Sequence, residues 1–363
     1  MFYYFTQLRD LFFGFNIFKY ITFRAAMAAV TTFILCVILG PIFTDIFKKW
    51  KIHEIAKRDD CPDLADFHKE KEGTPTMGGV FIVVSIIVSV LLWADLSNRF
   101  VVVTMVTCIY LAVLGFIDDL VKLKRLKAHS RGLRARTKFV WEIFLGCFIG
   151  SYIYYHPQTL TELDVPFFKN LVLNIGILYI PLAALIVVGT SNAVNLTDGL
   201  DGLAIGCIFI VSCTLGVLSY LSGHIQFSAY LFIPYIPGAG ELTIFCAAIA
   251  GASLGFLWYN CFPATIFMGD TGSLSLGGVL GVISVMIKKE LLLVLLGGVF
   301  VIEALSVILQ VWSVKTRHKR IFKVSPLHHH LQLCGWKESK IITRFWILGI
   351  IFALIALTTL KVR

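Results

Sequence analysis

Five aspartates stand where apolar stretches of the chain end, in three short segments. Asp118 and Asp119 are in "GFIDDLVK", Asp198 and Asp201 are in "SNAVNLTDGLDGLA", and Asp270 is in "YNCFPATIFMGDTGSLSLGG". A carboxylate beside an apolar segment is costly to bury unless it is paired, hydrated or bound to a cation. Because oxygen ligands of this kind suit a hard divalent cation, we expect magnesium rather than zinc.

One of these acids also has a purely structural explanation. An acid at the start of a helix is stabilised by the helix dipole, which would account for Asp198 alone. That explanation fails for Asp118 and Asp119, because they follow a span at its C-terminal end, where the dipole disfavours negative charge. Asp198 and Asp201 are three residues apart, so they would share one face if their segment were helical.

Two glycine-rich turns and three lysines provide groups that can bind an anion. "MGDTGSLSLGG" and "GTPTMGG" both lead into apolar spans. Backbone N–H groups at the start of a helix can hold a phosphate. Lys71, Lys122 and Lys138 lie close in sequence to these turns or to the aspartates and can bring positive charge to an anionic substrate. Each lysine is equally explained as an ordinary basic residue beside a membrane span.

Three consecutive histidines, His328, His329 and His330, lie in the stretch "FKVSPLHHHLQL". Neighbouring side chains point about 100° apart on a helix and to opposite faces of a strand, so three in a row cannot all face one ion. Zinc sites use spaced ligands, whereas a loop that presents one or two imidazoles suits a phosphate. We therefore expect these histidines to contact a phosphate or a sugar rather than to chelate a metal.

The rest of the chain must form the scaffold that positions these groups. Of its 363 residues, 58% are hydrophobic and 15% are charged, and the mean hydropathy is +0.83, which excludes an ordinary soluble domain. Apolar stretches of roughly 17–25 residues are typical of transmembrane helices. Ten are predicted, at 23–47, 78–94, 99–117, 139–155, 174–190, 203–222, 241–259, 274–287, 291–313 and 341–361. We therefore expect an all-α polytopic membrane protein with about ten transmembrane helices, in a single domain over residues 1–363.

The basic residues predict how these spans are oriented. Seven lysines and arginines lie in the loop 48–77, eight in 118–138 and seven in 314–340, whereas the loops on the opposite face together hold four. By the positive-inside rule, the basic loops are cytoplasmic and both termini are periplasmic. The aspartates and histidines would then share the cytoplasmic face. Since this bias accounts for the net charge of +10, no nucleic-acid partner is expected.

Six motifs taken together resemble one group of membrane enzymes. They are "KEGTPTMGG", "FIDDLVK", "NLTDGLDGLA", "NCFPATIFMGDTGSLSLGG", "FVIEALSVILQ" and "PLHHH". Over essentially its whole length the chain resembles the polyprenyl-phosphate N-acetylhexosamine-1-phosphate transferase superfamily. The first and last motifs favour the phospho-N-acetylmuramoyl-pentapeptide transferase branch of it.

The resemblance implies a reaction, a cofactor and a place in the cell. Members of this branch transfer phospho-N-acetylmuramoyl-pentapeptide from UDP-N-acetylmuramoyl-pentapeptide to undecaprenyl phosphate and release UMP, with magnesium ion as cofactor. They are multi-pass proteins of the bacterial inner membrane, in contact with membrane lipid, and a homodimer is expected. Whether the chemistry takes one step or passes through a covalent aspartyl-phosphate stays open.

The matching motifs also imply roles for individual residues. Asp118 is implied as the general base, Asp119 as its essential neighbour, and Asp270 as both a catalytic residue and the magnesium ligand. His329 is implied as a catalytic member of the histidine loop. Further substrate-pocket positions are implied at Lys71, Thr76, Lys138, Asn195, Asp198, Asp201, Asn260, Phe267, Ser273, Gln310, His328 and His330.

The sequence departs from the family pattern beside the histidines, and two alternative functions are also compatible with it. Leu331 and Gln332 stand where the family commonly has an aromatic residue and a glutamate, so a carboxylate is missing beside the histidines. A sibling enzyme that transfers N-acetylglucosamine-1-phosphate to the same lipid is the nearest alternative. A transporter is the alternative from another class, since intramembrane acids such as Glu303 often mark ion paths. Glu303 and Gln310 are seven residues apart and are expected on one helix face.

Overall fold

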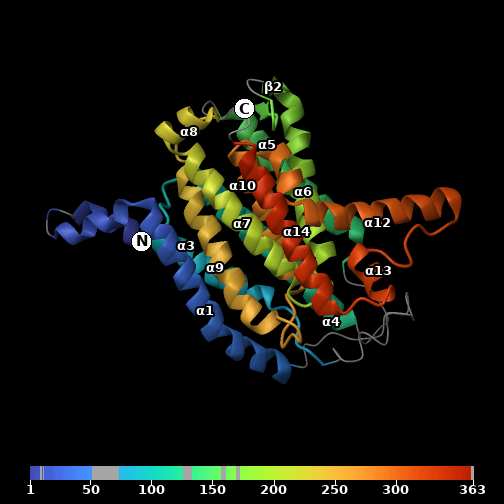
Figure 1. Cartoon of the computed structure of the whole chain (residues 1–363). Coiled ribbons are helices and arrows are strands. Elements are labelled where there is room, and N and C mark those ends of the chain that lie inside the picture. Colours follow the sequence, from blue (N-terminus) through green and yellow to red (C-terminus); the bar gives the residue numbers. More distant parts are fainter. Residues whose placement is uncertain are drawn as a thin grey trace.

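A computed structural model describes the chain over residues 1–8, 10, 12–50, 73–125, 133–156, 161–168 and 172–360, and all structural statements below concern these residues. Helices dominate, and they pack side by side into one bundle (Figure 1). The predicted all-α class is therefore confirmed. One short antiparallel hairpin is added, in which Leu163 pairs with Leu173.

Nine of the ten predicted spans each overlap one long helix, and the tenth, 291–313, is divided between two helices. In chain order the long helices are α1 (Ile21–Lys49), α3 (Gly79–Trp93), α4 (Arg99–Arg125), α5 (Ala135–Tyr155), α6 (Tyr179–Thr197), α7 (Leu203–Ser222), α9 (Leu242–Asn260), α10 (Gly269–Met286), α12 (Gly298–Arg317) and α14 (Glu338–Thr358). The shorter elements are η1 (Phe2–Leu8), η2 (Phe13–Lys19), β1 (Glu162–Asp164), β2 (Val172–Asn174), η5 (Gly176–Leu178), α8 (Ile225–Leu231), η6 (Ala239–Glu241), α11 (Glu290–Leu296) and α13 (Leu327–Leu333).

Eight helices in the described part of the chain are long and apolar enough to cross a membrane. The chain is thus a multi-pass membrane protein. Two predicted spans fall outside this group: α3 is apolar but has only 15 residues, and α5 carries charged side chains that lower its hydropathy. The count of ten spans and the periplasmic position of both termini therefore stay predictions.

Helix α10 forms the centre of the bundle. Every residue from Thr271 to Met286 is buried, and the helix packs against α3, α4, α6 and α7. Close approach depends on small residues, as is usual between membrane helices. A Cβ atom on Gly115 of α4 would lie 2.4 Å from the carbonyl oxygen of Asp270, and one on Gly79 of α3 would lie 2.1 Å from the amide nitrogen of Gly272. The first turn of α10 is therefore held against two neighbouring backbones.

Replacing Gly115 by alanine tests this close approach. We expect Gly115→Ala to lower the free energy of unfolding by about 1–3 kcal/mol, because the added methyl group must push α10 away from α4. Thermal unfolding of the purified protein measures the change. Gly189→Ala is the matched control, since Gly189 lies in a neighbouring helix and its Cβ would meet nothing within 4 Å. Equal melting temperatures for the two variants would contradict the packing described here.

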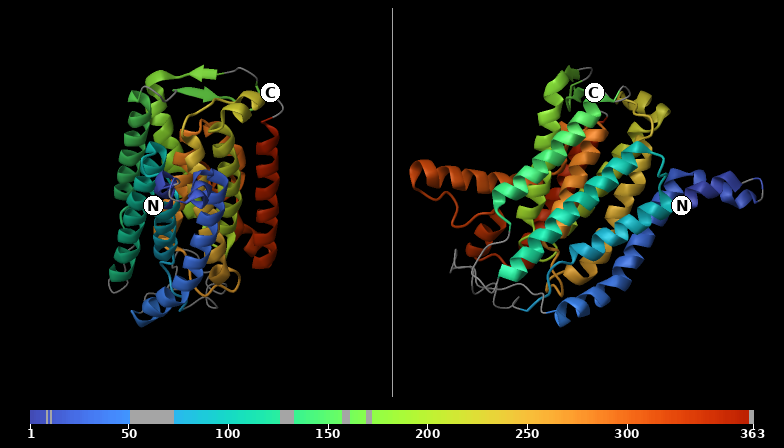
Figure 2. Two further views of the ribbon diagram at one scale, coloured as in Figure 1. Left: turned by 90° about the vertical axis from the view of Figure 1, so that its left-hand side faces the viewer. Right: turned by 180° about the vertical axis from the view of Figure 1, so that it is seen from behind.

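The predicted span 291–313 is not one helix, which corrects the sequence analysis. Helix α11 ends at Leu296, Gly297 separates it from α12, and α12 then runs to Arg317. Figure 1 shows α12 leaving the bundle sideways. The physical cause is the Gly297–Gly298 pair, because glycine weakens a helix interior. The same view from behind shows η1 and η2 projecting on the opposite side of the bundle (Figure 2).

Candidate active site

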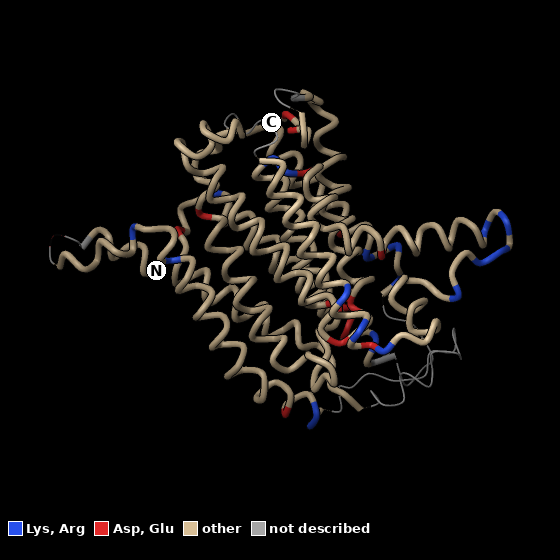
Figure 3. The backbone as a smooth tube through the Cα atoms, viewed as in Figure 1, with Lys and Arg blue, Asp and Glu red and all other residues tan. Residues whose placement is uncertain are grey.

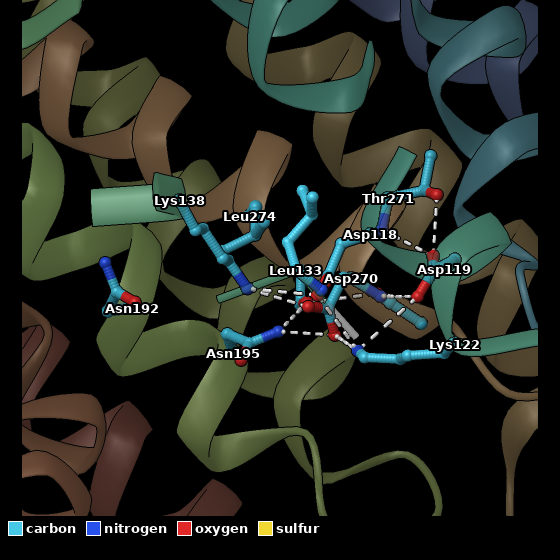
Figure 4. A network of polar contacts seen from close by, with 12 residues as sticks. Asp118, Asp119, Lys122, Leu133, Lys138, Asn192, Asn195, Asp270, Thr271 and Leu274 are labelled. Atoms are coloured by element: carbon cyan, nitrogen blue, oxygen red, sulfur yellow. Dashed lines mark hydrogen bonds and ion pairs between the residues drawn. The ribbon is translucent and has the colours of Figure 1, made fainter. Parts of the chain in front are cut away.

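A compact group of acidic and basic residues lies toward the end of the bundle opposite the C-terminus (Figure 3). Asp118 and Asp119 lie near the C-terminal end of α4, and Lys122 follows one turn later. Asp270 lies in the first turn of α10, and Lys138 lies in the first turn of α5. Three helices thus bring their ends together here, and they place three carboxylates next to two ammonium groups (Figure 4).

Asp270 is the centre of this network. Its Oδ1 lies 2.8 Å from Lys122 Nζ and accepts a 3.1 Å hydrogen bond from Asn195 Nδ2. Its Oδ2 accepts a 2.7 Å hydrogen bond from Lys138 Nζ. The side chain is 13% exposed, so these partners cover most of it while leaving one edge open. The predicted site residues Asp270, Lys138 and Asn195 are therefore in direct contact.

Asp118 shares both lysines with Asp270. Its Oδ2 lies 3.2 Å from Lys122 Nζ and 3.7 Å from Lys138 Nζ, and its Oδ1 accepts a 2.6 Å hydrogen bond from the backbone N–H of Leu133. The residue itself is only 4% exposed. Because two cations bridge Asp118 and Asp270, the two carboxylates stay close in spite of their like charges.

Asp119 makes different contacts from Asp118. Its carboxylate accepts hydrogen bonds from the backbone N–H groups of Asp270 (3.2 Å) and Thr271 (3.0 Å), and from Thr271 Oγ1 (2.8 Å). These donors belong to the first turn of α10, so a side chain from α4 caps another helix at its positive end. Sequence reasoning missed Thr271 and this cap, because capping by a residue 152 positions away leaves no local signal.

The carboxylates of this network fit a divalent cation only in part. Lys122 Nζ lies 2.8, 3.2 and 3.8 Å from oxygens of Asp270, Asp118 and Asp119, so three carboxylates already surround one positive charge. In the described part of the chain, no group of three or more His, Cys, Asp or Glu side chains is set to hold an ion by itself. Magnesium commonly takes one or two carboxylates and completes its shell with water and substrate phosphate. The all-oxygen donor set fits magnesium in that partial way.

The segment that carries Asp198 and Asp201 is a turn, so the helical-face argument for these two acids does not apply. Helix α6 ends at Thr197, Asp198 follows as its C-terminal cap residue, and α7 begins only at Leu203. Asp201 is 3% exposed; its Oδ2 accepts a 2.9 Å hydrogen bond from the N–H of Ala264. The turn is thereby tied to the segment that precedes α10.

Asn260 strengthens the same connection. Its Oδ1 accepts a 2.9 Å hydrogen bond from the N–H of Gly202, and its Nδ2 donates a 2.9 Å hydrogen bond to the carbonyl oxygen of Ile266. The residue is 4% exposed. Its amide therefore supports the backbone on both sides of the site, and the predicted substrate contact stays untested.

Three more predicted pocket residues, Thr76, Phe267 and Ser273, lie in segments that adjoin this network. Phe267 and Thr76 are half-buried, and their segments are joined by a 2.8 Å hydrogen bond from the N–H of Phe267 to the carbonyl oxygen of Pro75. Ser273 is buried and accepts a 2.8 Å hydrogen bond from Asn195 Nδ2. Lys71 lies outside the described residues.

The three histidines occupy the short helix α13. His328 has no exposed surface, His329 is 4% exposed, and His330 is half-buried. His328 is therefore fully covered by protein here, and its contact with substrate stays a prediction. Gln332 Oε1 lies 2.8 Å from His329 Nδ1, so an oxygen acceptor is present beside the catalytic candidate although the family's usual carboxylate is missing.

Gln310 lies on the buried face of α12 together with Glu303, as predicted. Its Oε1 accepts hydrogen bonds from the N–H groups of Ile321 (3.0 Å) and Phe322 (2.9 Å), and its Nε2 donates to the carbonyl oxygen of Phe322 (3.0 Å). The side chain thus holds the loop between α12 and α13. Contact with substrate stays a prediction for this residue.

A second polar pair near the site was missed. Glu142, four residues after Lys138 on α5, is 1% exposed and accepts a 2.5 Å hydrogen bond from Asn192 Nδ2. The other oxygen of Glu142 has no hydrogen-bond partner among the described residues. The signal was available, since a glutamate inside an apolar span is unusual.

Comparisons with known proteins agree with this geometry. Residues 100–288 match the profile of Glycosyl transferase family 4, and residues 71–83 match Phospho-N-acetylmuramoyl-pentapeptide-transferase signature 1. The curated Phospho-N-acetylmuramoyl-pentapeptide-transferase of a Geobacter species is 51% identical over 349 residues, which cover 96% of each chain. Proteins of the same name from Desulforapulum autotrophicum and Thermodesulfovibrio yellowstonii are 49% and 48% identical over 96% and 98% of each chain. The chain therefore belongs to the phospho-N-acetylmuramoyl-pentapeptide-transferase family.

Proposed function

We propose that this protein transfers phospho-N-acetylmuramoyl-pentapeptide from UDP-N-acetylmuramoyl-pentapeptide to undecaprenyl phosphate, with release of UMP. An oxygen of the lipid phosphate attacks the phosphorus that carries the sugar, a new phosphoanhydride bond forms, and the bond to UMP breaks. The proposal rests on one observation above all, the buried ring of Asp118, Asp119 and Asp270 around two lysines. Such a site can bind and orient phosphate groups, and positioning supplies much of the rate in phosphoryl transfer.

The charges of the ring support a need for magnesium. Two ammonium groups, on Lys122 and Lys138, stand against three carboxylates, so the ring carries a net charge of 2 − 3 = −1 when all groups are ionised. Both substrates are phosphate anions, and this ring alone would repel them. Asp270 is the residue that we assign to hold magnesium, with substrate phosphate oxygens as further ligands. Magnesium bound there would neutralise the diphosphate and stabilise UMP as it leaves.

The chain's own side chains have separable roles in this proposal. Lys122 and Lys138 already point at the carboxylates, and on substrate binding they can move to phosphate oxygens, which are also acceptors. Asp118 stands between both lysines and orients the lipid phosphate; a phosphate monoester is largely ionised at neutral pH, so little deprotonation is required. His329 is assigned to the sugar or phosphate side. We assign the nucleotide side to Asp198 and Phe267.

The proposal also covers where the protein acts and with what. The ring lies at an end of the bundle, which suits a water-soluble nucleotide and a lipid whose phosphate reaches the membrane surface. We place this end at the cytoplasmic face of the bacterial inner membrane, on the sidedness of the basic loops. A homodimer is part of the same proposal.

The experiment is UMP release by the purified protein in detergent with undecaprenyl phosphate. UDP-N-acetylmuramoyl-pentapeptide and UDP-N-acetylglucosamine are supplied in separate reactions. Release with the muramoyl donor alone is expected. Release with the glucosamine donor alone would assign the protein to the sibling reaction. If protein with a cooperative melting transition released no UMP with either donor, transferase activity would be refuted. The alternative function as a transporter would then be favoured.

Metal removal gives a separate prediction. EDTA is expected to lower UMP release by at least about a hundredfold, because the ring by itself cannot offset the charge of the diphosphate. Added magnesium should restore the rate, and calcium should restore less, since it prefers more ligands at longer distances. A rate that is unchanged by EDTA would contradict the assignment of Asp270 as a magnesium ligand.

A further inference from the structure

Glu303 of α12 and His328 of α13 form an isolated polar pair inside the protein. Neither residue has any exposed surface. His328 Nδ1 lies 3.2 Å from Glu303 Oε2 in an ion-pair contact. None of the four polar atoms, the two ring nitrogens and the two carboxylate oxygens, has a hydrogen-bond partner among the described residues, so the 3.2 Å charge contact is the polar interaction that joins the pair. Each residue therefore depends on the other.

The contact matters to both groups because no hydrogen bond from the described residues reaches either side chain. A carboxylate only accepts hydrogen bonds, and an ionised carboxylate that is buried without a donor is strongly destabilising. His328 Nδ1 is the nitrogen that faces the carboxylate of Glu303. The pair then ties α13 to α12, and breaking it by removing one partner would leave a buried charge uncompensated.

The far edge of the His328 ring meets the turn that follows α6. A Cβ atom on Gly199 would lie 2.3 Å from His328 Nε2, and the three nearest atoms to that Cβ all belong to His328. Gly199 follows Asp198 directly in this turn, and Asn195, four residues before it, donates to Asp270. Contacts therefore run continuously from Glu303 through His328 to the turn and on to the carboxylate ring.

We propose that Glu303 and His328 are positioning residues: the pair fixes the histidine helix α13 against the turn 198–202, and so holds His329 and Asp198 at the site. His328 itself touches no substrate. All three histidines were predicted to contact substrate; the proposed role of His328 differs from those of His329 and His330. The inference rests on the proposed function for the identity of the substrates, but not for the contact between the elements.

Two substitutions of His328 distinguish a positioning role from a chemical role of its imidazole. Asparagine places its amide near the position of Nδ1, so His328→Asn can still donate to Glu303. Glutamine places its amide near the position of Nε2 and cannot meet both Glu303 and the turn. We expect kcat/KM for the nucleotide donor within about fivefold of the wild-type value for His328→Asn, and a loss of about thirtyfold or more for His328→Gln.

A second-site test uses Gly199. Gly199→Ala should raise the donor KM and lower kcat/KM by about thirtyfold, because the methyl group displaces the imidazole of His328 and the turn 198–202. In Gly199→Ala/His328→Asn the shorter side chain leaves room for that methyl group, so the double variant should be more active than Gly199→Ala alone. Gly189→Ala, on the same helix α6 and facing open space, should match the wild type.

Melting temperatures of the wild type, His328→Asn, Gly199→Ala and the double variant keep this test independent of activity. The melting temperature should fall in Gly199→Ala and recover in the double variant, since contacting sites are not additive. This result can be read even if the wild type releases no UMP, so failure of the proposed function is distinguishable. Additive losses in both melting temperature and donor KM would overturn the inference. Greater activity for His328→Gln than for His328→Asn would also overturn it, because the Nε2 position would then be the one that matters.

Discussion

Asp270→Asn is expected to lower kcat by about 10³-fold or more, the largest effect of any single substitution in the ring. The carboxylate meets Lys122, Lys138 and Asn195 at once, and an amide would turn one N–H₂ group toward cationic or donor partners. In the proposed function this residue also holds magnesium, so the substitution removes positioning and charge together. Fold and membrane insertion should persist, since the backbone of α10 is capped by Asp119.

The measurement is kcat for UMP release at saturating substrate and magnesium, with the melting temperature recorded beside it. Asp45→Asn is the matched control, because Asp45 is an exposed carboxylate near the C-terminal end of α1. The control should retain wild-type kcat. A kcat for Asp270→Asn within tenfold of the wild-type value would remove this residue from the centre of the site.

Asp119→Ala is expected to reduce both stability and activity. Three hydrogen bonds to the first turn of α10 are lost, and loss of a helix cap costs about 1–2 kcal/mol of unfolding free energy. Activity should fall by about 10²-fold or more, because that turn carries Asp270 and a small misplacement is costly. Asp119→Asn keeps one acceptor oxygen, so its melting temperature should lie between those of the alanine variant and the wild type.

Comparison with Thr271→Val separates the parts of the cap. This variant removes one of the three hydrogen bonds while it leaves the carboxylate of Asp119 in place. We expect a smaller loss of activity and a smaller fall in melting temperature than in Asp119→Ala. If Asp119→Ala lost activity with no change in melting temperature, Asp119 would act on the substrate directly rather than through α10.

The spans were predictable because membrane helices need long apolar stretches, and the chain provides them. The predicted span 203–222 coincides with α7, and the acids of α4 lie at its end as expected. The break at Gly297 was not predicted, since a run of apolar residues hides an interruption by glycine. The glycine pair permits the break, but the direction that α12 then takes depends on its contacts with α6, α13 and α14, which lie far from it in sequence or follow it.

The candidate site, like the fold, was predictable from the sequence in some parts and not in others. Residue types predicted a phosphate site, and the structure brings Asp118, Asp270 and Lys138 into contact, while their roles toward a phosphate stay predictions. The argument that Asp198 and Asp201 share one face assumed a helix at this turn, although Gly199 and Gly202 weaken a helix there. The cap by Asp119 depends on contacts between distant segments, so it appears only once the helices are packed.

The most direct test of the central claim follows two phosphorus atoms. The donor UDP-N-acetylmuramoyl-pentapeptide is labelled with ³²P either at the phosphate next to uridine or at the phosphate next to the sugar, and is mixed with undecaprenyl phosphate, magnesium and the protein. We predict that the sugar-side label moves into the lipid extracted by organic solvent, while the uridine-side label stays in water as UMP. If both labels stayed in water, with or without cleavage of the donor, the protein would not be a phospho-sugar transferase to lipid.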